Sequence, residues 1–556
     1  MMNSGLHSTI AFVSLALIFS VMLSVSASAA PAAAPAALDD WTIMYYAVGE
    51  AKIQDDQITA LNQINESHKP GRGVNFICQF DYQDKPAQLY VLKDKFVIMG
   101  SSSDGTISDN MGNPETLYKF LKYGITNYPA SHYALIIDSH GSGIESYRGA
   151  GSTADRPVSF REFWKSFYEM DDILDATAYD YDDNDCLTLV EARGAIMKAM
   201  ARHNEGRRLD VMFNAACWQM MAEWNGQIRD CVKYVIACPT TCYCSAPAVA
   251  GFIHKLCRNK LTPLQVAQRI AEDYIDDVSK ETIIAAIDSE QYDDFILAFN
   301  RWLYMFIREL PDSGGVGFKS AAFVDPEHDG NQRFVSFRSL ISSVLAGKLT
   351  FKPSAKLLEA ARALSSQYDK CLAASWRKGY EGAGGMSIYF PIESKQWKSF
   401  RNHYAVMNLA VETLWDEYLD FARGVEGPEG SDKFLLLVRG LKRLHDEVSF
   451  RKAQFERAEA ASLSGAKTLF ARSLQSANGL AADMEALFAL SVREDLARGG
   501  ESILRYAAFL DRTSAEGKRD FAGLNALILK TMKASQADGS CSMNESGQKK
   551  VMKLLN

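Results

Sequence analysis

A histidine and a cysteine that each follow an apolar run are the residues of this sequence best suited to do chemistry. His140 comes after the run 133–138, and Cys217 comes after the run 209–214. A free thiol has a pKa of about 8.5 and is mostly protonated at neutral pH, but a neighbouring histidine can convert it into a thiolate. The two residues therefore suggest a thiol nucleophile with an imidazole base.

The residue after the histidine adds a third component. Gly141 has no Cβ, so the carbonyl of a ligand can approach its backbone, and the N–H groups of Gly141 and Cys217 could together bind an oxyanion. Spacing alone also allows a simpler interpretation. A cysteine after a strand is commonly a small buried hydrophobic residue, and a histidine before a glycine is commonly a turn residue.

The elements that must position these residues alternate between strands and helices. Short β-rich runs at 41–47, 74–80, 133–138, 209–214 and 234–237 are separated by helical patterns, and 89–100 is typical of a hairpin. This alternation predicts an α/β domain with a mostly parallel sheet covered by helices on both faces. Ligands of such sheets bind beyond the carboxyl ends of the strands, where both residues stand. A late run at 384–391 is expected to return to the same sheet.

The chain is long enough for more than one domain. All eight tryptophans precede Leu419, and the remainder is rich in Ala, Leu, Arg, Lys and Glu with apolar residues at helical spacing. We therefore expect an α/β domain at 40–425 followed by a separate all-α region at 431–533. Residues 534–556 are expected to form a loose polar tail.

The first residues differ in composition from the rest. An apolar stretch at 9–25 ends in small residues, which is typical of a secretory signal with cleavage near Ala29. We predict a signal peptide at 1–29 and a flexible leader at 30–39, although no Lys or Arg precedes the apolar stretch and a membrane anchor is the alternative. No later segment has the length of a membrane span. The mature chain is expected to be exported, to the periplasm or the extracellular space.

Composition and cysteine spacing narrow the classes of function. Apolar residues make up 47% and charged residues 23%, as in folded proteins, and the net charge of −8 without a basic run argues against nucleic acid as a partner. Cys238, Cys242 and Cys244 lack the paired spacing of a zinc site, so disulfides or buried thiols are expected.

From Trp41 to about Phe421 the sequence resembles the clostripain family of cysteine peptidases, which share a caspase-like α/β fold. The resemblance implies a catalytic dyad of His140 and Cys217, and Glu223 also matches the family pattern. It further implies a peptide or protein substrate, and cleavage of the precursor between the two loops, for which 146–160 is a candidate. The stretches that carry the resemblance are WTIMYYA, VNFICQFDY, NMGNPETLYKFLKYGITNYPASHYALII, the His-Gly turn, CLTLVEARGAI, the cysteine loop and GGMSIYFP.

The sequence departs from the family around the substrate. Family members that cleave after Arg or Lys have an aspartate two residues before the cysteine, where this chain has Ala215. Trp218 follows the cysteine and either lines the substrate pocket or packs in the core. The stretches 49–51 and 238–242 differ as well. We therefore expect strict Arg specificity to be lost.

One acidic stretch has the spacing of a calcium loop. Asp180, Asp182, Asn184 and Glu191 stand at the first, third, fifth and twelfth positions of an EF-hand, but Asp185 replaces the sixth-position glycine. The alternative is a capping box in which Thr188 and Glu191 begin a helix. The chemistry of a Cys–His pair requires no cofactor, and calcium dependence is known in the family.

These observations favour a secreted or periplasmic cysteine endopeptidase that works through a thioester. The rival hypothesis is an inactive homologue that binds a peptide or a partner in the same crevice. In either case the helical region is a candidate surface for a partner or for self-association.

Overall fold

The computed structural model describes residues 38–555 apart from several internal segments. These segments are 50–52, 68–72, 84, 142, 144–175, 181, 184, 244–245, 320–333, 381–382, 406, 425–431 and 513–520. The predicted signal peptide, residues 30–37 of the predicted leader and the candidate cleavage loop 146–160 therefore lie outside the described residues.

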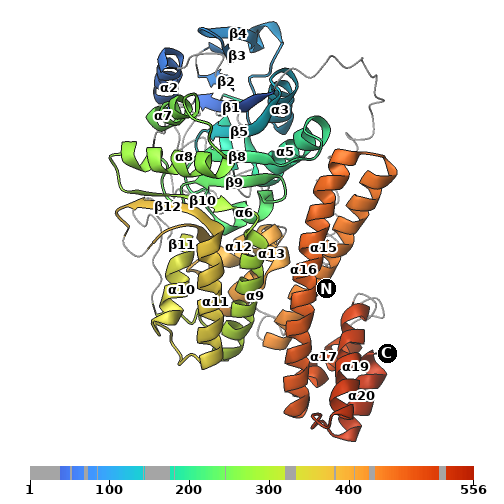
Figure 1. The fold of residues 1–556 in the computed structure, drawn as a ribbon. Helices are drawn as coiled ribbons and strands as arrows, with labels where there is room; N and C mark the ends of the chain where they lie inside the picture. The colour runs from blue at the N-terminus through green and yellow to red at the C-terminus, as the bar shows by residue number, and fades with distance from the viewer. Residues whose placement is uncertain are drawn as a thin grey trace, which may run out of the picture.

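A nine-stranded sheet forms the centre of the α/β part (Figure 1). Its five central strands run parallel to one another, whereas two strands at each edge pair antiparallel. The central strands are buried on both faces, which explains their nearly continuous apolar sequences. In spatial order the strands are β12 (Leu372–Lys378), β10 (Thr282–Asp288), β9 (Val232–Ala237), β8 (Leu209–Ala215), β5 (Ala130–Asp138), β1 (Asp39–Gly49), β2 (Val74–Tyr82), β3 (Lys85–Leu92) and β4 (Phe96–Ser101).

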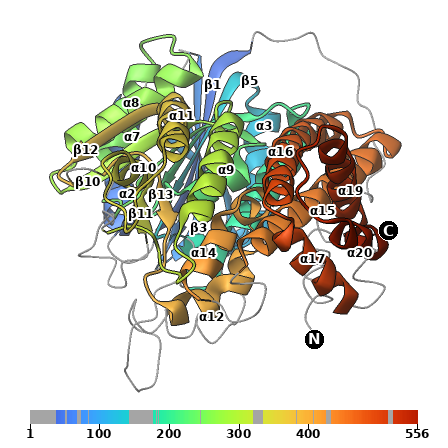
Figure 2. The ribbon, with the colours of Figure 1, turned by 90° about the horizontal axis from the view of Figure 1, so that it is seen from below.

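Helices cover the two faces of this sheet and enclose two apolar cores. Figure 2 shows the helices on either side of the strands. The first face carries α2 (Ile53–Ser67), α7 (Ala246–Leu256) and α8 (Pro263–Asp277). The other carries α3 (Pro114–Asn127), α5 (Leu189–His203), α6 (Ala222–Ile228) and α9 (Tyr292–Glu309), with α10 (Phe337–Leu345), α11 (Ala355–Cys371), α12 (Ser394–Tyr404), α13 (Asn408–Glu412) and α14 (Trp415–Ala422) beyond. The predicted α/β architecture, with an all-α region after it, is confirmed.

The strand that was expected at 384–391 does not join the main sheet. Residues 387–389 form β13 (Ser387–Tyr389), which pairs with β11 (Phe334–Ser336) in a small sheet of its own. The strand that joins the main sheet there is β12, whose exposed edge position gives it a mixed polar sequence that the pattern did not reveal. Gly385, with a φ of 68°, turns the chain away from the main sheet just before β13.

The C-terminal region is entirely helical where it is described. Its first two helices form a long hairpin that lies along the α/β part, and the remaining helices pack at the far end of that hairpin (Figure 1). The expectation of a loose polar tail is wrong, because Met543, Val551 and Leu555 are buried and join the tail to the core. The helices are α15 (Lys433–Ala460), α16 (Ser464–Ala497), α17 (Glu501–Arg512), α19 (Ala522–Ala537) and α20 (Glu545–Leu555).

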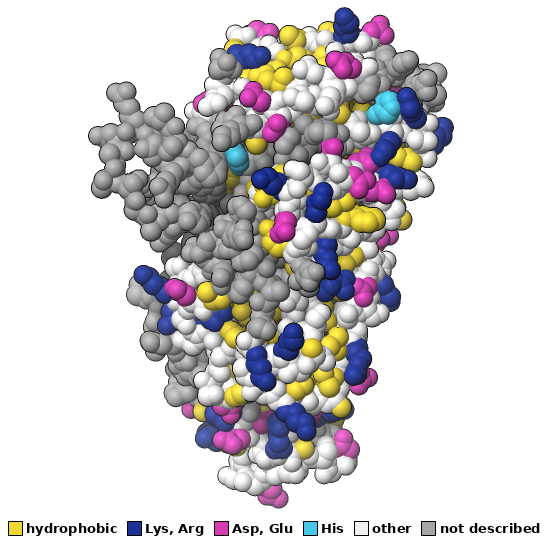
Figure 3. Space-filling model, turned by 90° about the vertical axis from the view of Figure 1, so that its left-hand side faces the viewer, with side chains coloured by type: hydrophobic (Ala, Val, Ile, Leu, Met, Phe, Trp, Pro, Cys, Tyr) yellow, Lys and Arg dark blue, Asp and Glu magenta, His cyan; other side chains and the backbone are white. Residues whose placement is uncertain are grey.

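The hydrophobicity of the helices and the distribution of surface side chains bear on which partners the protein could bind. None of the described helices has the length and apolar character needed to cross a bilayer. On the face in Figure 3, acidic and basic side chains are interspersed, and apolar side chains gather near the top. Edge strand β4 contributes exposed Val97, Ile98 and Met99 to the surface.

Candidate active site

Two neighbouring parallel strands bring His140 and Cys217 to the same edge of the sheet. Asp138 at the end of β5 is in register with Ala215 at the end of β8, and each candidate stands two residues beyond this pair. The loops that follow are in contact, because a Cβ built on Gly141 would lie 2.6 Å from the carbonyl oxygen of Cys217. Only glycine fits this approach, which explains the His-Gly sequence.

The thiol of Cys217 receives a backbone hydrogen bond from a third loop. The N–H of Cys242 donates to Sγ of Cys217 over 3.3 Å, and the carbonyl oxygen of Cys242 lies 3.7 Å from the same sulfur. The N–H donor favours the thiolate, whereas the carbonyl, to which the S–H donates, favours the thiol. Sequence reasoning missed this contact, although Cys242 follows β9, the next parallel strand of the sheet, and so stands at the same edge.

The imidazole of His140 is half-buried beyond the end of β5. Burial lowers its pKa from the ordinary value of 6.5 to about 4, so the ring is neutral at pH 7. A neutral imidazole can accept a proton from a thiol. The end of β5 that supports it is anchored by two buried side chains, since the Tyr45 hydroxyl donates to Asp138 over 2.6 Å and Gln57 donates to the Asp138 carbonyl over 2.9 Å.

Backbone hydrogen bonds hold the loop that carries the thiol. The N–H of Trp218 donates to the Thr240 carbonyl and the N–H of Met220 to the Cys238 carbonyl, both over 3.0 Å. Trp218 has a φ of 56°, in the left-handed region that non-glycine residues seldom adopt. Such strained residues persist where the surroundings over-determine them, and they cluster at functional sites.

Ala215 and Trp218, which were predicted to line a substrate pocket, lie on opposite faces of the sheet. Ala215 is buried among the apolar side chains on the α7 and α8 face of the sheet. Trp218 is half-buried and packs against the core on the opposite face. Glu50 and Glu145, two acids that could replace the missing aspartate as partners of a cationic substrate side chain, lie outside the described residues.

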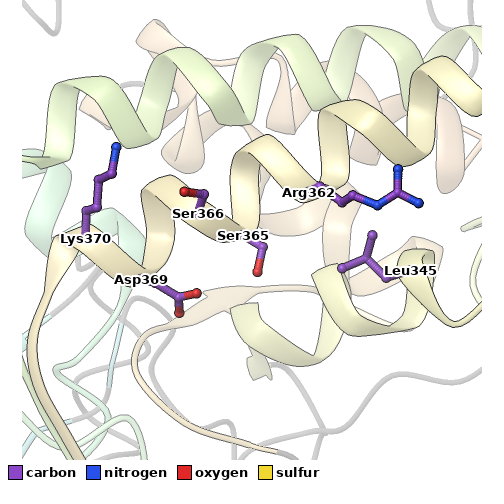
Figure 4. A pocket seen from close by; sticks show the side chains of 6 residues that line it. All are labelled: Leu345, Arg362, Ser365, Ser366, Asp369 and Lys370. Atoms are coloured by element: carbon purple, nitrogen blue, oxygen red, sulfur yellow. The ribbon is translucent and has the colours of Figure 1, made fainter.

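Two cavities of the structure lie away from the dyad. One, of about 530 Å³, is bounded by α11 and the end of α10, where the side chains of Arg362, Asp369 and Leu345 line it (Figure 4). The other, of about 700 Å³, lies between α9 and the helices of the C-terminal region. Neither is lined by His140 or Cys217.

The carboxylate of Glu223 anchors helix α6, which follows the thiol loop. Its Oε1 accepts hydrogen bonds from the Tyr404 hydroxyl over 2.7 Å and from the Tyr389 N–H over 3.0 Å. The side chain has no solvent exposure, and this burial raises its pKa from 4.5 to about 7. Glu223 therefore joins α6 to β13 and α12 rather than facing the substrate.

This burial predicts an unusual pH dependence of stability. Because the folded pKa of Glu223 lies above its unfolded value, the folded state loses stability as the pH rises from 4.5 through 7. In Glu223→Gln the Oε1 can accept the same two hydrogen bonds without this cost. We expect the variant to exceed wild type in free energy of unfolding by roughly 2–3 kcal/mol at pH 8 and to match it at pH 4.5.

Urea denaturation at the two pH values measures this difference. The matched control is Glu545→Gln, which removes a carboxylate that is 90% exposed and should leave the pH dependence unchanged. A Glu223→Gln variant that is no more stable than wild type at pH 8 would show that the buried carboxylate carries no such penalty.

The acidic residues of the calcium prediction lie on a hairpin and a helix start. β6 (Ala176–Asp180) pairs antiparallel with β7 (Asp185–Thr188), and Asp180 accepts hydrogen bonds from the Met111 and Asp183 N–H groups. The capping-box alternative is confirmed, because Glu191 and Thr188 make both reciprocal bonds. Asp182 lies in the turn and Asn184 outside the described residues. Within the described part of the chain, no three His, Cys, Asp or Glu side chains are grouped closely enough to hold a metal.

The cysteines of the described chain are thiols. Six of these nine are buried and three are half-buried, and Cys244 lies outside the described residues. For these nine, the buried-thiol alternative fits better than disulfides. Only Cys217 among them follows a strand of the main sheet next to the histidine loop.

Comparisons with known proteins agree on one family. The family model described as the clostripain family, peptidase C11, matches residues 46–421. The curated clostripain of Hathewaya histolytica is 26% identical over 125 residues, which are 18% of this chain and 23% of the relative. This chain thus spans less than a quarter of that relative's length.

Solved structures of C11 proteases are similar to this chain. An inactive zymogen C11 protease from Parabacteroides distasonis has a TM-score of 0.48 and 16% identity over 68% of this chain and 98% of its own. A secreted C11 cysteine protease from Bacteroides thetaiotaomicron, called iotapain, has a TM-score of 0.48 and 15% identity over 66% and 99%. Since the family model covers most of the α/β part, including both His140 and Cys217, this chain belongs to the clostripain family.

Proposed function

We propose that this protein is an exported cysteine endopeptidase in which Cys217 is the nucleophile and His140 the general base. The observation that carries the proposal is the register of β5 and β8, which places the two loops in contact at the carboxyl edge of the sheet. Membership of a peptidase family supports the reaction class. The backbone donor to Sγ and the lowered pKa of His140 suit the two residues to these roles.

In this mechanism His140 takes the thiol proton of Cys217 as the sulfur attacks the peptide carbonyl. The N–H groups of Gly141 and Cys217 stabilise the oxyanion of the tetrahedral intermediate. The C–N bond then breaks, and the imidazolium gives its proton to the leaving amine, which leaves a thioester on Cys217. His140 next activates water, which attacks the thioester and releases the acid and the thiol.

The substrate preference follows from the residue two positions before the nucleophile. Where family members that cleave after Arg or Lys have a carboxylate, this chain has the buried Ala215, and loss of a buried charge partner for a cationic P1 side chain costs about 2–5 kcal/mol. We expect the preference for Arg at P1 to fall by roughly 30-fold to several thousand-fold, so that small or apolar residues are favoured. The measurement is kcat/KM across a P1 library. A preference for Arg more than about a hundredfold above Ala and Leu would contradict this expectation and indicate a substitute carboxylate.

Peptide hydrolysis tests the reaction class directly. Mass spectrometry of unstructured peptides incubated with the protein should show cleavage of internal peptide bonds that is absent in Cys217→Ala. If peptides bind but remain intact, the rival hypothesis holds, and the protein is an inactive homologue that binds peptides or partners in the same crevice. Intact peptides with no binding would contradict both hypotheses.

A further inference from the structure

A buried ion-pair cluster joins the C-terminal region to the helix that follows the nucleophile. Arg229 at the end of α6, Glu412 at the end of α13 and Arg451 on α15 are at most 4% exposed. Nη2 of Arg229 lies 2.8 Å from Oε1 of Glu412, and Nη2 of Arg451 lies 2.6 Å from the same oxygen. One carboxylate oxygen is therefore shared by an arginine of the α/β part and an arginine of the helical region.

Helix α16 contributes to the same cluster. Nη2 of Arg229 donates to the Ser476 hydroxyl over 3.1 Å, and that hydroxyl donates to Asp293 over 2.8 Å. Nε of Arg229 also bonds Asp293 over 2.8 Å. Burial alone would raise the pKa of the adjacent Asp230, but Arg229 and Arg451 lower it to about 2. Nη1 donates to the Gly226 carbonyl, so each guanidinium nitrogen of Arg229 has a partner. Two of these partners connect Arg229 to the helical region: Ser476 lies on α16, and Glu412 is bonded to Arg451 on α15.

Helix α6 is buried along its whole length, and hydrogen bonds hold both of its ends. It is seven residues long, and its first turn is held within the α/β part through Glu223. Its last turn is held by α13, where Asn408 donates to the Gly226 carbonyl, and by the Arg229 cluster. A helix of two turns moves nearly as a rigid body, so a shift of Arg229 is transmitted to the loop of Cys217, which stands five residues before the first residue of the helix.

We propose that the C-terminal helical region is a positioning part of the active centre: Arg451, through Glu412 and Arg229, holds helix α6 and thereby the thiol loop. This inference rests on the proposed function of Cys217. It assigns a role to a region that lies beyond the segment matched by the family model. Arg451 is a positioning residue, because it touches neither substrate nor the reacting atoms.

The chain provides a matched control for this role. Arg443 also lies on α15 and pairs with two buried carboxylates of the α/β part, Asp416 and Glu417, but these belong to α14 and have no bond to α6 in the described structure. Arg451→Met removes a buried arginine and Arg443→Met a half-buried arginine between the same two regions. Only the first should disturb the thiol loop.

The experiment compares both full-length variants with wild type at a temperature where all three are folded. We expect Arg451→Met to lower kcat by about tenfold to a hundredfold with KM within about twofold, because a small misplacement of the nucleophile is costly. Alkylation of Cys217 by iodoacetamide should slow in parallel. Arg443→Met should lower the melting temperature but keep kcat and the alkylation rate within about twofold of wild type. Arg451→Lys, which keeps a charge beside Glu412, should recover part of the loss.

Several outcomes would overturn the inference. An Arg451→Met variant with lowered melting temperature but wild-type kcat and alkylation rate would show a purely structural role, as would equal losses in both variants. If Arg451→Met does not fold, Ser476→Ala, which removes one hydroxyl, takes its place with an expected loss in kcat of about threefold, and unchanged kcat and alkylation would overturn the inference. Wild type without peptidase activity would refute the proposed function instead, and the alkylation rates would still test the positioning role.

Discussion

Replacement of Cys217 by alanine is expected to abolish peptide hydrolysis and leave the fold intact. Without the sulfur no thioester forms, so kcat/KM should fall by at least about a thousandfold. The cost to stability is small, because the described contacts of Sγ are with the backbone of Cys242 and the side chain is only half-buried. The measurements are kcat/KM on the preferred peptide and the melting temperature.

Cys242, whose backbone contacts the sulfur of Cys217, is the alternative candidate for the nucleophile. Should activity survive in Cys217→Ala and vanish in Cys242→Ala, the nucleophile would be Cys242, which stands at the same edge of the sheet. A Cys217→Ala variant that loses both activity and its melting transition would leave the chemistry unresolved, so Cys217→Ser serves as the second variant. It is closest in size and should be equally inactive.

Replacement of His140 by alanine is expected to slow hydrolysis by about a hundredfold to ten-thousandfold, because the general base and the acid for the leaving amine are both lost. The variant should also be alkylated more slowly at neutral pH, because no base beside Cys217 remains to take the thiol proton. Kinetics together with the pH dependence of alkylation measure both effects. A variant with wild-type kcat/KM would remove His140 from the mechanism.

The pH dependence of the wild-type enzyme distinguishes two states of this pair. Burial lowers the pKa of His140 to about 4, so the neutral base should persist in the free enzyme, and kcat/KM should fall only as the pH approaches that value. His140 has its ordinary pKa of 6.5 in the unfolded chain, so it binds a proton more readily there than in the folded chain. Stability should therefore decline as the pH falls from 6.5 through 4, and His140→Ala should lack this decline. If kcat/KM instead begins to fall at or above pH 6.5, the active form would be a thiolate–imidazolium pair.

Local patterns in the sequence were sufficient to predict most of the α/β part and the sheet edge at which His140 and Cys217 stand. Apolar runs ending at Asp138 and Asn214 marked two strands, and their parallel order placed the residues after them at one edge. The capping box at Thr188 and Glu191 was readable because it depends on neighbours in sequence.

The features that could not be predicted from the sequence depend on contacts between residues far apart in the chain. The donor of Cys242 reaches Cys217 across 25 residues, and Arg229 meets Glu412 across 183. Strand β12 was missed because an exposed edge strand needs no apolar alternation. Helix α20 was missed because three apolar residues in a polar segment are enough to dock a short amphipathic helix.

Covalent labelling with a peptidyl chloromethyl ketone tests the central claim most directly, because the reagent alkylates fastest the thiol beside which the bound peptide places it. Intact mass and peptide mapping of the wild-type chain should show one adduct, on Cys217, that forms much faster than in His140→Ala and that abolishes hydrolysis in proportion to its extent. An adduct on another residue, or an active enzyme that carries the adduct on Cys217, would contradict the assignment of Cys217 as the nucleophile.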